Sequence, residues 1–201
     1  PRVRRQRQMC IRDRSRDEAH AKGLIHRVAH CWVVSPREDG FWVWFQQRAH
    51  SKRDFPGFYD IAVGWHVGAG ERVETAIARE IQEEIGLQVT PDKLRYLGAF
   101  RDDICIAGFD DRELAEVFLY LDAAPVFRVG EEVERMVCLP LNDLLRKERG
   151  EAAVTAYSVS GEAVEIRAEE WCRHDGEMEQ FLLPALQGVK SVSYTHLRAH
   201  E

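Results

Sequence analysis

A glycine-rich stretch followed by one amphipathic helix, within residues 64–87, constrains the fold of this 201-residue chain more than any other segment. The helix is predicted from about residue 72 to residue 85, because isoleucines recur at every fourth position along it (Ile77, Ile81 and Ile85). The glycine at the next position is a suitable residue to end a helix, since it adopts the left-handed conformation freely. An apolar stripe of this kind needs a hydrophobic surface to cover.

Strand-like patterns on both sides of the helix can supply that surface. The predicted strands cover residues 24–34, 40–46, 58–63, 94–100, 115–121 and 134–139. The polar turn Ser-Pro-Arg-Glu-Asp-Gly joins the first two strands into a hairpin, and further helices are predicted around residues 141–149 and 181–186. Strands before and after one central helix indicate an α/β fold in which a mixed β-sheet is packed between helices.

Length and composition indicate one globular domain. Hydrophobic residues make up 45% of the chain and charged residues 31%, with a mean hydropathy of −0.39, which is typical of a soluble protein. No apolar run approaches the roughly 18–20 residues that a membrane helix needs. The five cysteines are scattered and never spaced as Cys-x-x-Cys, which favours reduced thiols over disulfides or a zinc site. We therefore expect a cytoplasmic protein without membrane contact.

Both ends of the chain resemble translated sequencing-adapter DNA. We interpret residues 1–14 and 191–201 as non-native segments and residues 15–190 as the domain. The alternative for the first segment is a natural basic arm that binds nucleic acid, which its six arginines would suit. Because this segment carries a net charge of +5 and the tail none, the whole-chain charge of −6 leaves −11 for the domain. A domain so acidic is not expected to bind nucleic acid, and a phosphorylated ligand would need a cation in the site.

Three glutamates share one side of the central helix. At 100° per residue, Glu80, Glu83 and Glu84 fall within an arc of about 100°, beside the isoleucine stripe. Like charges at these spacings destabilise a helix by roughly 0.2–0.5 kcal/mol per pair, and a bound cation removes that repulsion. Oxygen ligands without His or Cys suit Mg²⁺ or Mn²⁺. The alternative interpretation is a solvated acidic face without a ligand.

The segment around this helix resembles the Nudix box, a motif of metal-dependent hydrolases. Glu71 is followed, after seven residues, by Arg-Glu-Ile-Gln-Glu-Glu-Ile-Gly-Leu at positions 79–87, and a match over the whole pattern is hard to obtain by chance. The resemblance implies the Nudix-type αβα sandwich. It also implies the reaction, in which water attacks the diphosphate bond of a nucleoside diphosphate derivative or another small phosphorylated metabolite while metal ions neutralise the phosphates.

The same resemblance implies roles for individual side chains of the helix. Glu80, Glu83 and Glu84 would hold Mg²⁺ or Mn²⁺, Arg79 would orient one of these carboxylates, and Glu71 would assist from the preceding loop.

One position departs from the motif, because the glycine expected six residues before Glu71 is Trp65. The nearest glycine is Gly64, whose backbone carbonyl is then the expected metal ligand from this loop. A tryptophan at this point brings bulk and is expected to cost on the order of 1–2 kcal/mol if its φ is positive. The fold should survive this change, but full activity is in doubt, so a Nudix scaffold that binds without catalysis is one alternative.

Beyond the box, the chain resembles the Nudix subgroup related to isopentenyl-diphosphate isomerase. The shared motifs are Gly-Leu-Ile-His-Arg (23–27), Arg48 with Ser-Lys (51–52), Phe-Pro-Gly (55–57), Asp-Ile (60–61) and Gly-Trp-His (64–66). The resemblance implies that His26 and His66 match metal-binding histidines of the isomerase, and His20 lies near a third. The alternative is that all three are surface or hydrogen-bonded histidines.

Three residues in these motifs are expected to contact the substrate. Arg48 and Lys52 are the cations best placed to hold a phosphate, the first as a fork and the second as a point charge, and His66 is expected beside them. Each could instead be an ordinary solvated residue.

An acidic run at residues 110–116 is the candidate source of a general base. In many Nudix enzymes an acid in this region acts as base or as an additional metal ligand, which implies that role for Glu113 or Glu116. We slightly favour Glu116, also as a metal ligand, because its strand would be directed at the central helix. Asp111 and Glu113 align best with two metal-binding acids of the isomerase. The alternative is a loop of solvated acids.

We interpret the chain as a Mg²⁺- or Mn²⁺-dependent Nudix hydrolase that acts on a small phosphorylated molecule, with a homodimer left open. Isomerisation is disfavoured because the isomerase has a proton-transferring cysteine two residues before the histidine that matches His66, whereas this chain has Gly64 there. The substrate cannot be named from the sequence, since specificity differs widely on one scaffold.

Overall fold

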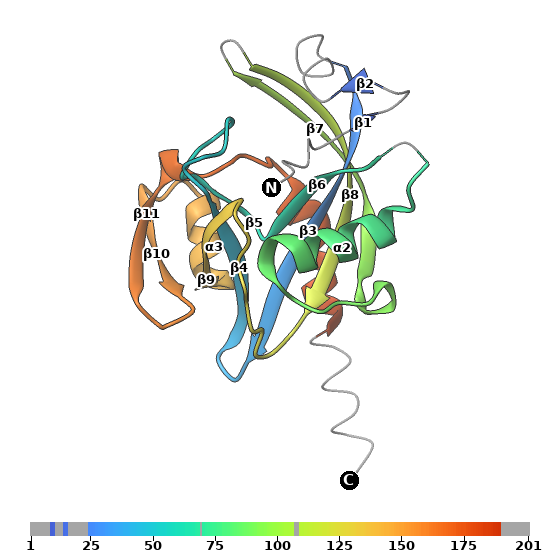
Figure 1. The fold of residues 1–201 in the computed structure, drawn as a ribbon. Helices are drawn as coiled ribbons and strands as arrows, with labels where there is room; N and C mark the ends of the chain where they lie inside the picture. The colour runs from blue at the N-terminus through green and yellow to red at the C-terminus, as the bar shows by residue number, and fades with distance from the viewer. Residues whose placement is uncertain (1–8, 11–13, 16–23, 69, 107–108, 190–201) are drawn as a thin grey trace.

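A nine-stranded mixed sheet is the centre of the fold in the computed structural model, which describes residues 9–10, 14–15, 24–68, 70–106 and 109–189 (Figure 1). The strands of this sheet are β3 (His26–Arg37), β4 (Gly40–Arg48), β5 (Tyr59–Ile61), β6 (Val63–His66), β7 (Arg95–Ile106), β8 (Phe109–Leu121), β9 (Val133–Pro140), β10 (Ala153–Ser158) and β11 (Ala163–Arg167). Their order is β11-β10-β9-β4-β3-β8-β7, with β5 paired to β4 and β6 paired to β3. Two further short strands, β1 (Met9–Cys10) and β2 (Arg14–Ser15), pair with each other.

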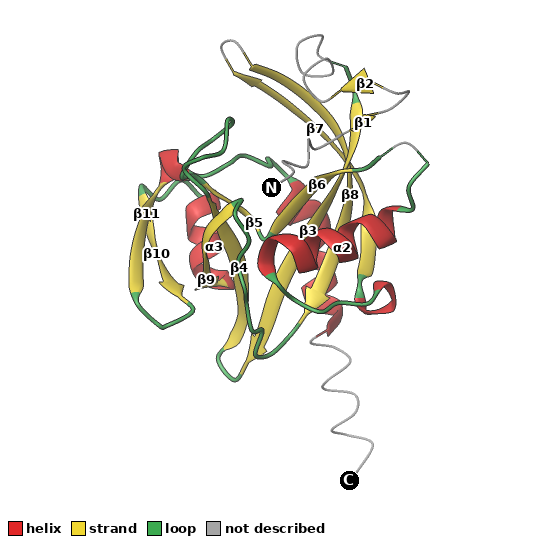
Figure 2. Cartoon of the chain, viewed as in Figure 1, coloured by secondary structure: helices red, strands yellow, loops and turns green. Residues whose placement is uncertain are grey.

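Helices cover both faces of the sheet (Figure 2). The helices of the described chain are α2 (Val73–Ile85), α3 (Leu141–Glu148), 3-10 turns at Pro91–Lys93 and Ala168–Glu170, and a C-terminal helix whose π-helical part is Met178–Leu182. The expectation of a mixed sheet between helices is therefore confirmed. None of the helices in the described ranges is long and apolar enough to span a membrane.

Strand β3 separates the two layers of the hydrophobic core because successive side chains of a strand point to opposite faces. Ala29, Cys31 and Val33 pack in the cluster that contains the isoleucine stripe of α2. Val28 and Trp32 pack in the other cluster, together with residues of α3 and of the C-terminal helix. Two apolar layers on one strand explain why β3 reads as an almost continuous hydrophobic run.

β3 also pairs in parallel with β8, whereas the other strand pairs of the described sheet are antiparallel. The register sets His26 opposite Glu113 and Ala29 opposite Glu116. It therefore brings a histidine from the start of the domain beside an acid almost ninety residues later.

The predicted elements are recovered with shifted ends, but two strand assignments differ. The sequence pattern predicts one strand at 58–63, whereas the chain forms β5 and β6 there, and β6 extends into the glycine-rich stretch. The hairpin of β10 and β11 was not predicted, because its strands are short and carry many polar residues. The proposed terminal segments and His20 lie largely or wholly outside the described residues.

Gly86 ends helix α2 as predicted, with a left-handed φ of 73°. A Cβ atom at this position would lie 2.6 Å from both the Cβ and the carbonyl oxygen of Arg128, so a side chain does not fit without movement of the backbone. We expect Gly86→Ala to lower the free energy of unfolding by more than the roughly 1–2 kcal/mol of the left-handed conformation alone, as measured by urea denaturation. Gly150→Ala is the control, since Gly150 also has a positive φ (92°) but a Cβ atom there would have no neighbour within 4 Å. Equal losses in the two variants would contradict the role of the Arg128 contact.

Candidate functional site

A pocket of about 100 Å³ lies beside β3, β5 and β6 and is bounded on one side by residues 172–174 of the C-terminal segment. The pocket is lined by six of the residues that were predicted to act in the site: Arg48, Lys52, Gly64, His66, Glu84 and Glu113. They come from three strands, one loop and helix α2. The fold thus brings together side chains that are spread over more than sixty positions of the chain.

Glu84 is the helix carboxylate that reaches the pocket. It is only 7% exposed, and burial raises its pKa to about 8. Its Oε2 atom is buried and accepts no hydrogen bond from any residue that the structure describes. A buried carboxylate oxygen without a partner is costly, and a divalent cation would supply the missing partner, so the residues present fit the metal that the motif implies.

The other two glutamates of the helix differ in their surroundings. Glu80 is buried, forms an ion pair with Arg79, and has its pKa raised to about 7 by burial. The side chain of Glu83 is 57% exposed, with one oxygen 3.9 Å from Arg79. Glu80 and Glu84 therefore form the inner part of the acidic arc, and Glu83 its solvent-facing edge.

Arg79 connects the helix to the loop before it. Its Nη2 atom lies 3.0 Å from Glu71 Oε1, and its guanidinium lies 5.8 Å from the centre of the Trp65 ring. Trp65 sits in β6 without a positive φ, since Phe55 is the non-glycine residue with a positive φ in the described chain. The backbone strain considered for Trp65 is therefore absent, because the residue takes part in regular pairing with β3.

A histidine pair and a glutamate lie next to this loop. The rings of His26 and His66 stack with centroids 4.8 Å apart and planes 6° apart. His26 Nε2 lies 3.5 Å from Glu113 Oε1, while its Nδ1 lies 3.1 Å from the carbonyl oxygen of Leu24. One ligand atom from each of the three side chains lies within 4.8 Å of the others, so the group could hold a metal ion.

The pocket cations are mostly engaged with acidic groups. Arg48 Nη1 lies 3.0 Å from Asp60 Oδ2, and the same guanidinium donates twice to the Asp54 carbonyl oxygen. Lys52 forms an ion pair with Glu132. Arg173 also lines the pocket and has no ion-pair partner among the described residues. Sequence reasoning missed Arg173, because it lies far from the motif and in no recognisable pattern.

Glu113 and Glu116 lie in different surroundings, since residues three apart on a strand point to opposite faces. Glu113 lines the pocket, whereas Glu116 does not. Glu116 accepts hydrogen bonds from Arg27 Nη2 and Tyr96 Oη, each at 2.7 Å. The side chain of Asp111 lies outside the described part of the structure.

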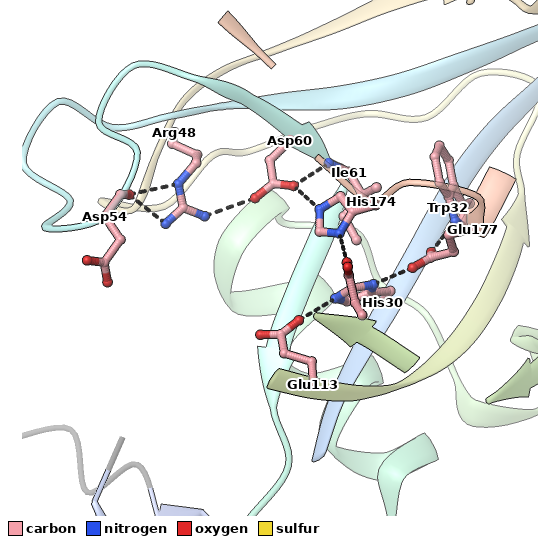
Figure 3. Close-up of polar contacts among 10 residues, drawn as sticks. His30, Trp32, Arg48, Asp54, Asp60, Ile61, Glu113, His174 and Glu177 are labelled. Carbon is pink, nitrogen blue, oxygen red and sulfur yellow. Dashed lines mark hydrogen bonds and ion pairs between the residues drawn. The ribbon is translucent and has the colours of Figure 1, made fainter. Parts of the chain in front are cut away.

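A second set of buried polar side chains was not predicted (Figure 3). His30 Nδ1 lies 2.7 Å from Glu177 Oε2, and Trp32 Nε1 donates to Glu177 Oε1 at 2.7 Å. His174 lies between Asp60 Oδ1 (2.8 Å from Nε2) and an aspartate of β7. Alternation along β3 places His30 on the same face as His26, and this spacing could be read from the sequence. No local pattern marked its C-terminal partner Glu177 or His174.

Comparison with known proteins defines the family. The family model of the NUDIX domain matches residues 24–158, and the chain therefore belongs to the Nudix family. It is 30% identical over 136 residues to an uncharacterized Nudix hydrolase of Clostridium acetobutylicum, covering 66% of each chain. It is 26% identical over 129 residues to isopentenyl-diphosphate Delta-isomerase 1 of Photorhabdus laumondii, covering 63% of this chain and 71% of the isomerase.

Solved structures agree on the fold. A MutT/nudix family protein from Enterococcus faecalis matches with a TM-score of 0.50 and 18% identity, over 70% of this chain and 49% of that protein. Among these curated relatives, the chain spans 20% of Nudix hydrolase 3 of Arabidopsis thaliana, 66% of the Clostridium protein and 71% of the Photorhabdus isomerase.

Proposed function

We propose that this protein is a divalent-metal-dependent hydrolase that cleaves the diphosphate bond of a small phosphorylated metabolite. The observation that carries the proposal is the buried oxygen of Glu84, which has no hydrogen-bond partner among the described residues and lies in a pocket that also contains cationic side chains. Bound Mg²⁺ or Mn²⁺ would supply positive charge at the diphosphate oxygens and favour formation of the nucleophile.

The residues of the helix and its preceding loop would hold the metal. Glu84 and Glu80 offer buried carboxylates, Glu83 offers an exposed one, and Gly64 offers the backbone of β6 at the pocket wall. Arg79 fixes the orientation of Glu80 through their ion pair. This arrangement uses oxygen donors, as Mg²⁺ and Mn²⁺ prefer.

The opposite side of the pocket would bind substrate and transfer the proton. Arg173 is placed to bind a phosphate because its guanidinium is not neutralised by a described acid, whereas Arg48 and Lys52 are paired with Asp60 and Glu132. Glu113 rather than Glu116 is the proposed base, since only the former lines the pocket. Burial acts to raise the pKa of Glu113, but His26 and His30 hold it well below its usual value, so this carboxylate is ionised.

The experiment is a phosphate-release screen with Mg²⁺ over nucleoside diphosphate derivatives, dinucleotides and prenyl diphosphates. Release that depends on metal and disappears in Glu84→Gln supports the proposal. Equal release by the wild type and this variant across all substrates would refute it.

Isomerisation is the second candidate, because the group of His26, His66 and Glu113 and the Photorhabdus relative both point towards it. The reaction needs an acid and a base on opposite faces of the substrate. The backbone of Gly64 lies at the pocket wall and carries no group that transfers a proton, while Cys31 is buried in the layer under α2. We therefore expect isopentenyl diphosphate with Mg²⁺ to give no dimethylallyl diphosphate, as measured by chromatography of the products. Catalytic formation of that isomer would establish the second candidate instead.

A further inference from the structure

A buried and a half-buried histidine meet between β3, β7 and the C-terminal segment, outside the carboxylate arc of α2. His30 is 3% exposed, Glu177 is 0% exposed and Asp102 is 6% exposed, and His174 is half-buried. The rings of His30 and His174 contact edge to face with centroids 4.8 Å apart. One ring nitrogen of each and one oxygen of Glu177 lie within 4.8 Å of one another.

Each of these imidazoles has a carboxylate at both nitrogens. At the Nδ1 atoms, His30 meets Glu177 Oε2 at 2.7 Å and His174 meets Asp102 Oδ2 at 3.0 Å. At the Nε2 atoms, His30 faces Glu113 Oε2 at 3.6 Å and His174 meets Asp60 Oδ1 at 2.8 Å. An imidazole donates from both nitrogens only when it is protonated, so ionised carboxylates at all four positions require two buried imidazolium groups side by side.

Two adjacent imidazolium groups repel each other, although the four carboxylates around them are negatively charged. Buried charges of this kind are stable only when they are fully compensated. One divalent cation carries the same charge as the two Nδ1 protons that it would displace, and it would place that charge between the donors rather than on two adjacent rings.

We propose that His30, His174 and Glu177 form a metal site that binds a transition-metal ion such as Zn²⁺, with Asp102 beside it. Two nitrogen donors and one carboxylate oxygen suit Zn²⁺, whose fourth position a water molecule can take. Donor–donor separations around tetrahedral Zn²⁺ are about 3.3 Å, so the 2.7 Å contact between His30 Nδ1 and Glu177 Oε2 needs to open slightly. Binding releases two protons to solvent.

The outer nitrogens already have the partners that metal-binding histidines require. A ligating histidine usually donates its other N–H to a carboxylate or carbonyl, which fixes the ring. Glu113 faces Nε2 of His30, and Asp60 accepts from Nε2 of His174. Asp60 is itself held by Arg48 and by the backbone N–H of Ile61 (Figure 3). Glu177 immediately precedes the π-helical turn, a feature that is frequent at functional sites.

The proposal does not depend on the proposed hydrolysis, although His30 and His174 line the same pocket as Glu113, so its test measures metal binding on the full chain. Zn²⁺ affinity and stoichiometry would be measured by competition with a chromophoric chelator, and Co²⁺ substitution would report the ligand field by absorption. His174→Gln and Glu177→Gln should each weaken this Zn²⁺ site by more than about 100-fold, beyond the 10–100-fold of an outer-sphere partner. Glu179→Gln, an exposed neighbour, and Glu84→Gln, on the helix, should retain it.

Circular dichroism establishes that each variant is folded before its binding is compared. Where a variant does not fold, His66→Gln decides, since it lacks one histidine of the other three-residue group and should still show the Co²⁺ spectrum of a tetrahedral site with nitrogen ligands. Wild-type protein that binds no Zn²⁺ at micromolar concentrations would overturn the proposal. Folded His174→Gln and Glu177→Gln proteins with wild-type affinity and stoichiometry would overturn it as well. Wild-type protein that binds Zn²⁺ at this site but releases no phosphate from any substrate would count against the proposed hydrolase alone.

Discussion

Glu84→Gln is expected to lower kcat by at least about 100-fold, because a catalytic metal contributes several kcal/mol and each 1.4 kcal/mol is a factor of ten. The amide keeps the size of the side chain but removes the negative charge from the buried oxygen that has no hydrogen-bond partner among the described residues. Mg²⁺ affinity should fall together with kcat. The fold should persist, since an uncharged group is easier to bury than a carboxylate. Isothermal titration with Mg²⁺ and phosphate release measure the two effects.

The control for this prediction is Glu74→Gln in the first turn of the same helix. Glu74 has a side chain that is 44% exposed and lies outside the pocket, so its neutralisation should leave kcat within a factor of two or so. If both variants keep wild-type turnover, the acidic arc is a solvated face and the proposed function fails.

Arg48→Met is expected to produce the largest loss of stability. The ion pair between Arg48 and Asp60 is largely buried, with side chains 14% and 12% exposed. Burial opposes ionisation of Asp60, but His174 and Arg48 hold its pKa well below the usual value. Removing one partner of a buried pair leaves the other charge uncompensated and typically costs about 3–5 kcal/mol. Urea denaturation of the variant measures this loss.

Arg146→Met is the matched comparison, since Arg146 makes exposed ion pairs with Asp143 and Glu151. Exposed pairs contribute little, so its unfolding midpoint should match the wild type. An Arg48→Met midpoint equal to that of Arg146→Met would show that the buried pair does not stabilise the fold.

Local patterns in the sequence predicted the parts of the molecule that depend on local physics. The isoleucine period and the glycine after it are enough to define α2 and its end, because helix periodicity and the left-handed cap act over a few residues. The same segment supplied Glu84. The more distant Arg48, Lys52 and His66 line the same pocket, but in the sequence only the resemblance to known proteins grouped them.

The remaining polar groups depend on contacts that no local pattern encodes. Glu177 contacts His30 across 147 positions, and His174 contacts Asp60 across 114. Such partners are set by strand register and by the path of the C-terminal segment, both of which are tertiary properties. A sequence motif can also identify a cationic residue without showing which group it pairs with. Arg48 was expected to bind a phosphate, whereas in the structure its guanidinium contacts Asp60 and the backbone carbonyl of Asp54.

The long separation between His30 and Glu177 has a consequence for synthesis of the protein. Translation adds about 5–20 residues per second, so roughly 7–30 s pass between these two positions, which are 147 residues apart. During that interval β3, β4 and α2 can already bury their isoleucine layer, while the imidazole of His30 stays in contact with water. The nascent chain can therefore acquire its apolar layer under α2 first, while the contact between His30 and Glu177 on the other face of β3 forms only when the C-terminal helix emerges from the ribosome.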